Sequence, residues 1–145
     1  MARLDDGFST KISFAADPTI LMYEKTVTPP GVSGGGPNDT TTMRNTAWRT
    51  MKPKKLKTLT AAAFTAAYDP ATYDEVVNNL VNVNTLITLT FSDNSTLAFY
   101  GWLNEFTPNE IQEGEQPTAG VSIEVSNEDN STPPVETAPN YTAPP

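Results

Sequence analysis

The sequence has no cysteine and no histidine among its 145 residues. Without cysteine it has no disulfide framework, no thiolate metal site and no cysteine nucleophile. Without histidine it lacks the usual general base near neutral pH and the commonest metal ligand. Three pairs of carboxylates are adjacent in sequence, but none has an evident base or oxyanion partner: Asp5 and Asp6, Asp74 and Glu75, Glu128 and Asp129. We therefore expect no enzyme, no cofactor and no metal site.

Positive charge is also absent from most of the chain. No lysine or arginine follows Lys57, although the 88 residues beyond it carry 12 carboxylates. Between Asp39 and Asp69 the pattern reverses, with no acid and six of the nine cations: Arg44, Arg49, Lys52, Lys54, Lys55 and Lys57. A subunit that docks head to tail on its own copies gains from this separation, because its basic segment meets an acidic face of the next copy. The alternative is chance clustering in an acidic protein.

The overall charge and the lack of long apolar runs exclude two classes of partner. A net charge of −8 argues against a nucleic-acid-binding protein, because phosphates would be repelled. It is compatible with a surface that nucleic acid passes without sticking. No apolar run approaches the about 20 residues that span a bilayer, and the first residues form no apolar signal core. We expect synthesis in a cytoplasm and no membrane partner.

The first third of the sequence predicts strands followed by a long loop. Residues 8–27 are strand-like, and Pro29-Pro30-Gly31 ends them. Residues 28–53 show no clear period, and a structureless loop of this length is usually functional or disordered. Met43, Trp48 and Met51 are poor choices for a loop in solvent, and Trp, Met and Arg are enriched where proteins meet. The alternative is that Trp48 folds back onto its own domain.

The middle of the chain predicts a strand and then one helix. Residues 54–68 alternate in polarity, which favours a strand, although their leucine and alanine spacing also fits a helix. Asp69 is a good N-cap, and Pro70 suits the first helical position. Apolar residues then recur at helical spacing, which predicts an amphipathic helix over about 70–81, with one face formed by Tyr73, Val76, Val77 and Leu80.

The remaining residues predict a hairpin, an acidic loop, a last strand and a tail. Residues 85–91 and 96–103 alternate on either side of Ser92-Asp93-Asn94-Ser95. In the second strand Tyr100 and Trp102 share the face opposite Leu97 and Phe99, so we expect burial on both faces or an interface. Residues 105–116 form an acidic loop, and a strand follows at 121–125. The Pro-rich residues 128–145 form a tail with no core of its own.

Together these elements predict a mainly β domain over residues 1–127, a β-sandwich or barrel with one flanking helix. The order of several segments resembles the major tail tube proteins of long-tailed bacteriophages. The segments are Pro29-Pro30-Gly31, residues 34–45, Trp48-Arg49-Thr50, residues 54–60, Tyr68-Asp69-Pro70-Ala71, the Asn-rich residues 78–84, the hairpin, residues 114–119 and residues 121–129.

The resemblance implies a structural virion protein, made in the cytoplasm of a bacterial host. Six subunits would form a ring whose sheets join around a lumen, and rings would stack head to tail into a tube that conducts double-stranded DNA during ejection. The partners at the tube ends would be other tail proteins: the tape measure, the terminator and the baseplate. The alternatives are another tail or capsid component, such as a terminator or decoration protein, or a β-sandwich binding module that uses Trp48, Tyr100 and Trp102 as a platform.

Two sets of residues are candidates for these contacts. The predicted contacts between subunits are Met43, Arg44, Trp48, Arg49, Met51, Lys52, Lys54, Lys55, Tyr100 and Trp102. The predicted acidic lumen or complementary face is Asp93, Glu105, Glu110, Glu113, Glu115 and Glu124.

Overall fold

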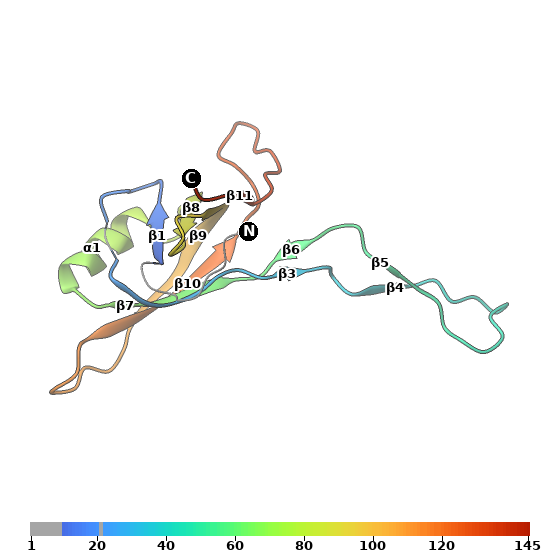
Figure 1. The fold of residues 1–145 in the computed structure, drawn as a ribbon, viewed down its shortest axis with the longest axis horizontal. Coiled ribbons are helices and arrows are strands. Elements are labelled where there is room, and N and C mark those ends of the chain that lie inside the picture. Colours follow the sequence, from blue (N-terminus) through green and yellow to red (C-terminus); the bar gives the residue numbers. More distant parts are fainter. Residues whose placement is uncertain (1–9, 21) are drawn as a thin grey trace.

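A computed structural model describes residues 10–20 and 22–145, and it consists of one main sheet, one helix and a long two-stranded arm (Figure 1). The adjacent carboxylates Asp5 and Asp6, and Phe8 at the start of the first expected strand, lie outside this described part. The main sheet contains β1 (Lys11–Phe14), β2 (Glu24–Thr28), β7 (Ala62–Ala67), β8 (Thr85–Thr90), β9 (Thr96–Pro108), β10 (Thr118–Val125) and β11 (Asn140–Thr142). Its order is β1-β8-β9-β10-β7-β2, with antiparallel pairing throughout, and β11 pairs with β9.

The core lies on one face of this sheet, which we call the inner face. Strand alternation puts every second side chain there: Ala62, Phe64 and Ala66 of β7 are buried, as are Ala119, Val121 and Ile123 of β10. Leu89, Phe99 and Leu103 complete the centre of the core and are at most 1% exposed. The mainly β class with a single helix is therefore confirmed.

Helix α1 (Pro70–Asn79) covers part of the inner face. It begins as the sequence predicts, because the Asp69 side chain accepts a hydrogen bond of 3.0 Å from the Ala71 amide and Pro70 follows the cap. It ends two residues before the expected 81. Val76 and Leu80 are fully buried, whereas Tyr73 and Val77 of the predicted apolar face are partly exposed.

The predicted hairpin is present. Strands β8 and β9 pair from Thr85 opposite Gly101 to Thr90 opposite Thr96. In the connecting turn, the Asp93 carboxylate accepts a hydrogen bond of 2.9 Å from the Ser95 amide. Strand β9 runs further than the sequence indicated, to Pro108, so Glu105 was wrongly placed in a loop. It lies opposite Ser122 of β10, where the outer face of the strand tolerates a charged side chain.

The long structureless loop was also a wrong expectation. Residues 29–60, which we call the arm, form two short antiparallel ribbons in line: β3 (Val32–Ser33) with β6 (Thr58–Leu59), and β4 (Pro37–Asp39) with β5 (Met51–Pro53). The strand expected from residue 54 accordingly begins only at Ala62, because the residues before it belong to the arm. Backbone hydrogen bonds hold such ribbons, so their sequence needs no apolar period.

The C-terminal residues return to the sheet. Strand β11 lies beside β9, with Tyr141 opposite Leu97. Before it, Asn84 Nδ2 donates to Asn130 Oδ1 and Asn130 Nδ2 donates to the Asn84 backbone carbonyl, both at 2.9 Å. The Ser126 hydroxyl donates to Asn84 Oδ1 at 2.7 Å. These contacts attach residues 128–145 to the domain, and the division of the chain at residue 127 stays a prediction.

Candidate assembly surfaces

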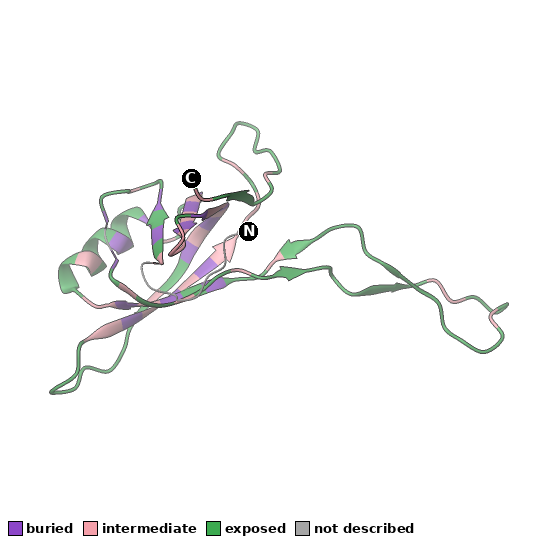
Figure 2. Ribbon diagram, in the orientation of Figure 1, coloured by how far each residue is buried: buried purple, intermediate pink, exposed green. Residues whose placement is uncertain are grey.

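The arm is exposed to solvent along its whole length. Figure 2 shows no buried residue along it, and none of residues 29–60 is buried. Several of its large apolar side chains stand in solvent: Met43 is fully exposed, Trp48 is 84% exposed and Leu56 is 81% exposed. Side chains of this size lose about 1.5–3 kcal/mol of burial energy when left in water. The alternative in which Trp48 folds back onto its own domain is therefore wrong.

The tip of the arm is nevertheless well ordered by hydrogen bonds. Asn45 Oδ1 accepts from the Thr42 amide at 3.1 Å, and Asn45 Nδ2 donates to the Trp48 carbonyl at 2.7 Å. The Thr50 amide donates to Thr41 Oγ1 at 3.0 Å. These bonds close the chain between residues 41 and 50 into a compact turn. Trp48 is thus presented on a pre-shaped tip, which lowers the entropy cost of docking it.

The arm also holds most of the positive charge. The arm contains six cations and a single acid, Asp39. Arg49 Nη1 lies 3.4 Å from Asp39 Oδ2, and this is the one ion pair within residues 10–20 and 22–145. Hydrogen bonds from the Thr41 side chain and amide, with a smaller part from Arg49, hold the pKa of Asp39 below its ordinary value. The other five cations have no ion-pair partner in the described structure.

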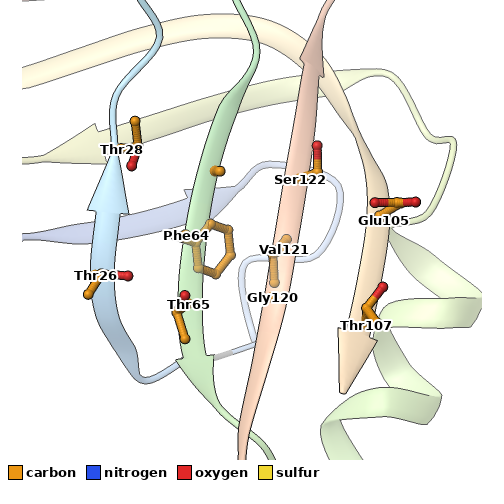
Figure 3. Close-up of a pocket in the computed structure, with 10 residues that line it drawn as sticks. Thr26, Thr28, Phe64, Thr65, Glu105, Thr107, Gly120, Val121 and Ser122 are labelled. Carbon is orange, nitrogen blue, oxygen red and sulfur yellow. The ribbon is translucent and has the colours of Figure 1, made fainter. Parts of the chain in front are cut away.

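The outer face of the sheet, opposite the core, forms a second surface. A shallow groove of about 410 Å³ crosses β2, β7, β10 and β9 (Figure 3). Its walls carry hydroxyl groups and one carboxylate, and its polar and small lining residues are Thr26, Thr28, Ala63, Thr65, Glu105, Thr107, Gly120 and Ser122. These hydroxyls were not predicted as a surface from the sequence. The sequence signal was weak, because Thr26 and Thr28 stand two residues apart on β2 but β7, β9 and β10 contribute one hydroxyl each, from Thr65, Thr107 and Ser122.

The structure separates the predicted acids into three places. Glu105 lines the groove, and Glu124 lies on the same outer face opposite Trp102. Asp93 is in the β8–β9 turn, where hydrogen bonds from the Ser95 hydroxyl and amide lower its pKa. Glu110, Glu113 and Glu115 are exposed on residues 109–117 between β9 and β10, and we call this segment the acidic loop from here on.

The predicted contact residues fall into two groups. Eight lie on the arm: Met43, Arg44, Trp48, Arg49, Met51, Lys52, Lys54 and Lys55. Tyr100 and Trp102 lie instead on the outer face of β9, half-buried. Trp48 is at the arm tip and therefore cannot share one flat platform with Tyr100 and Trp102 on the sheet, as the binding-module alternative required.

The described residues form neither a metal site nor a membrane-spanning helix. Within the described residues, no three Asp or Glu side chains are arranged to hold a metal ion. The helix in this part of the chain is too short and too polar to cross a membrane.

Comparisons with known proteins point to one structural group. A chain in the tail of the empty gene transfer agent particle, determined with helical refinement and C6 symmetry, matches with a TM-score of 0.61. The match has 10% identity and covers 95% of this chain and 98% of that one. A chain of the native gene transfer agent virion matches with a TM-score of 0.59 and 11% identity over the same shares.

A third match is to the baseplate of the anti-feeding prophage, with six-fold symmetry imposed. Its TM-score is 0.52, with 8% identity over 81% of this chain and 87% of that one. No family model matches the sequence, and no curated protein matches it. At such low identities the likeness shows the fold. The chain therefore has the fold of subunits in these phage-like tails, the fold that the sequence resemblance implied.

Proposed function

We propose that this chain is a structural subunit of a phage tail tube, assembled as stacked hexameric rings through which double-stranded DNA passes. The observation that supports this most strongly is the fold match to a tail with C6 symmetry. The matched span covers 95% of this chain and so takes in the arm as well as the sheet. An arm with no buried residue has no stabilising role within its own subunit, and neighbours in a tube would give it one.

Ring formation would occur through the sheet edges. Strands β1 and β2 end the sheet, so each pairs with only one strand of it, and the Ile12 amide of β1 donates to the Glu24 carboxylate of β2 at 3.0 Å. Open edges of this kind pair readily with other chains, and closure into a ring removes them. Strand β11 lies along β9 and covers neither terminal strand, so β1 and β2 would be the strands that meet neighbours within a ring.

The arm would make the contacts between rings. Its tip presents Met43, Trp48 and the two arginines, side chains that recur at the energetic centres of protein interfaces. Its length lets it reach beyond the sheet domain of its own subunit (Figure 1).

The outer face of the sheet would line the lumen, because the core and helix α1 occupy the other face. The groove there has hydroxyls and Glu105 but no cation in its lining, and Glu124 lies on the same face. Contacts between phosphates and cations create most DNA affinity, so the groove favours passage without binding. Lys11 of β1 lies on the outer face but outside the groove lining. Asp93, Glu110, Glu113 and Glu115 lie between strands and not on the strands of this face, so the proposed lumenal acids are Glu105 and Glu124.

The further partners follow from the same proposal. The tube would meet a tape measure inside, a terminator at one end and a baseplate at the other, and the subunit would reside in the virion after synthesis in the host cytoplasm. Neither catalysis nor a cofactor enters the mechanism.

A second candidate is a component at the end of the tube, such as a terminator or a baseplate ring. The match to the anti-feeding prophage baseplate favours it. Such a component would form a single ring, whereas a tube subunit elongates without limit.

Negative-stain electron microscopy of the purified protein over a concentration series separates these candidates. Hollow tubes of variable length are the expected result for a tube subunit. Isolated six-fold rings at every concentration would indicate the tube-end component. Uniform monomers at every concentration, also after addition of preformed tail tips, would contradict both.

A further inference from the structure

We propose that the lysine-rich middle of the arm docks on the acidic loop of a second copy of this chain. This inference rests on the proposed function, and it names the two surfaces that meet when one copy stacks on the next. The lysine-rich segment is residues 52–57, and the acidic loop is residues 109–117.

The lysine-rich segment concentrates charge without neutralising it. Lys52, Lys54, Lys55 and Lys57 lie within six residues, and none has an ion-pair partner in the described structure. The strand alongside contains the glycine run 34–36, which places no side chain beside residues 54–57, whereas Lys52 lies opposite Asn38. The space over Gly35 is taken up instead by the Lys54 stem, whose Cδ would lie 3.4 Å from an added Cβ. Four neighbouring cations repel one another, and an acidic partner would relieve that repulsion.

The acidic loop has the complementary features. Glu110, Glu113 and Glu115 are exposed, and their carboxylates accept no hydrogen bond from any described residue. Ile111 stands among them with 62% of its surface exposed. A turn with Gly114 at a φ of +83° shapes the loop, and the Glu115 amide donates to the Gln112 carbonyl at 3.3 Å. Three free carboxylates beside an apolar side chain match the mixture of lysines and exposed Leu56 on the arm.

Other acids are less suitable as acceptors because they are already engaged. Asp129 accepts hydrogen bonds of 3.0 Å from the amides of Ser131 and Val135, and these lower its pKa. Asp93 is held by Ser95 in the same way. Asp74 accepts from the Asn78 side chain at 3.3 Å. Glu128 and Glu136 face each other in an isolated bridge, so they offer two carboxylates but no third.

The placement of the two surfaces suits a repeating contact. In Figure 1 the arm extends to one side of the sheet domain, and the β9–β10 connection projects on the opposite side. A surface at one end that binds a different surface at the other end is heterologous, and it generates open-ended stacks. The arm and acidic loop of one subunit therefore serve different neighbours.

Zero-length carbodiimide cross-linking tests the contact directly. Unlabelled and ¹⁵N-labelled proteins are mixed, assembled, cross-linked and digested with chymotrypsin, because no tryptic site exists beyond Lys57. The expected result is mixed-isotope peptides that join residues 52–57 to Glu110, Glu113 or Glu115. Assemblies whose arm lysines link instead to Glu128, Glu136 or the helix acids would overturn the docking proposal and leave the tube function standing. The absence of assemblies and of mixed-isotope links would overturn both.

A charge exchange provides a second test. We expect Lys52→Glu/Lys54→Glu/Lys55→Glu to stay monomeric, and likewise Glu110→Lys/Glu113→Lys/Glu115→Lys. An equimolar mixture of the two should assemble, because each arm then finds an oppositely charged loop. The matched control, Asp74→Lys/Glu75→Lys on α1, should assemble alone. Failure of the mixture to assemble, while both variants keep the wild-type circular dichroism spectrum, would overturn the proposal. Retention of a short DNA duplex by the arm lysines of assembled wild-type protein would also overturn it.

Discussion

The sheet domain and the arm are held together in different ways. The sheet buries Leu89, Phe99 and Ile123 completely, and its strands share one core with helix α1. The arm buries none of residues 29–60 and is held by backbone pairing and by side-chain hydrogen bonds at its tip. An isolated two-stranded ribbon is at best marginally stable in water. A change in the sheet should therefore act on folding, and a change in the arm should act on assembly.

The largest expected effect is the loss of assembly when residues 34–49 are deleted. The sheet should remain folded, because no deleted residue is buried, whereas elongation should stop completely. Circular dichroism with thermal melting reports the fold, and electron microscopy reports the tubes. Normal tubes from this deletion would show that the arm makes no essential contact.

Phe99→Ala in the core should instead act on folding. Phe99 is 1% exposed, so the truncation leaves a cavity and should lower the free energy of unfolding by about 3–5 kcal/mol. Urea denaturation of the monomer measures this change. A loss below about 1 kcal/mol would mean that the inner face is not the packed core described above.

Trp48→Ala sharpens the comparison at the arm tip. Monomer stability should change by less than about 0.5 kcal/mol, because the side chain is 84% exposed. If Trp48 is an interface anchor, its loss costs about 2 kcal/mol of contact energy and raises the critical concentration for assembly more than tenfold. Sedimentation over a concentration series gives that value. An unchanged critical concentration would remove Trp48 from the contact.

Two glycines, one in the sheet and one in the arm, allow a matched pair of Gly→Ala substitutions. A Cβ on Gly101 would lie 2.2 Å from the Glu124 carbonyl oxygen, where β9 approaches β10, whereas a Cβ on Gly34 would meet nothing within 4 Å. We expect Gly101→Ala to destabilise the monomer by about 1–3 kcal/mol through overpacking. Gly34→Ala should leave thermal unfolding unchanged. Equal effects of the two substitutions would contradict the close approach at Gly101.

The smallest expected effect is a pH dependence shared by both regions. The pKa values of Asp39 in the arm and of Asp93 and Asp129 in the sheet domain are lowered, chiefly by hydrogen bonds from neighbouring residues. Their stabilisation is present above the unfolded value of 3.8 and is lost as the pH falls through the lower folded values. Melting temperatures measured below pH 5 should therefore fall less steeply in Asp93→Asn than in wild type. Glu110→Gln is the control, because its carboxylate accepts no hydrogen bond from a described residue.

Elements with a local signal, such as a helix cap or a turn, could be predicted from the sequence. Elements held only by backbone pairing between segments without an apolar period could not. Asp69 and Pro70 predicted the start of α1, and the turn at residues 92–95 predicted the hairpin. The arm ribbons were missed because backbone pairing leaves no apolar period in a segment rich in Gly, Thr and Pro. Glu105 was misplaced because charge alone does not distinguish a loop from the outer face of a strand.

The candidate surfaces were predictable in composition but not in arrangement. The exposed tryptophan and the clustered lysines could be recognised from residue type alone. That Tyr100 and Trp102 lie on the sheet and not beside Trp48 depends on how the arm leaves the domain, which no local pattern encodes. The hydroxyl-lined groove was missed because it needs Thr26, Thr65 and Ser122 to meet across strands distant in sequence.

Hydrogen–deuterium exchange of the monomer and of the assembled protein tests the central contrast most directly. Amides of β7, β8, β9 and β10 should be protected in both states, because the core exists without neighbours. Amides of β3 to β6 should exchange within seconds in the monomer and become protected on assembly. Strong protection of the arm in the monomer, or continued rapid exchange of the arm in the assembled state, would contradict the account.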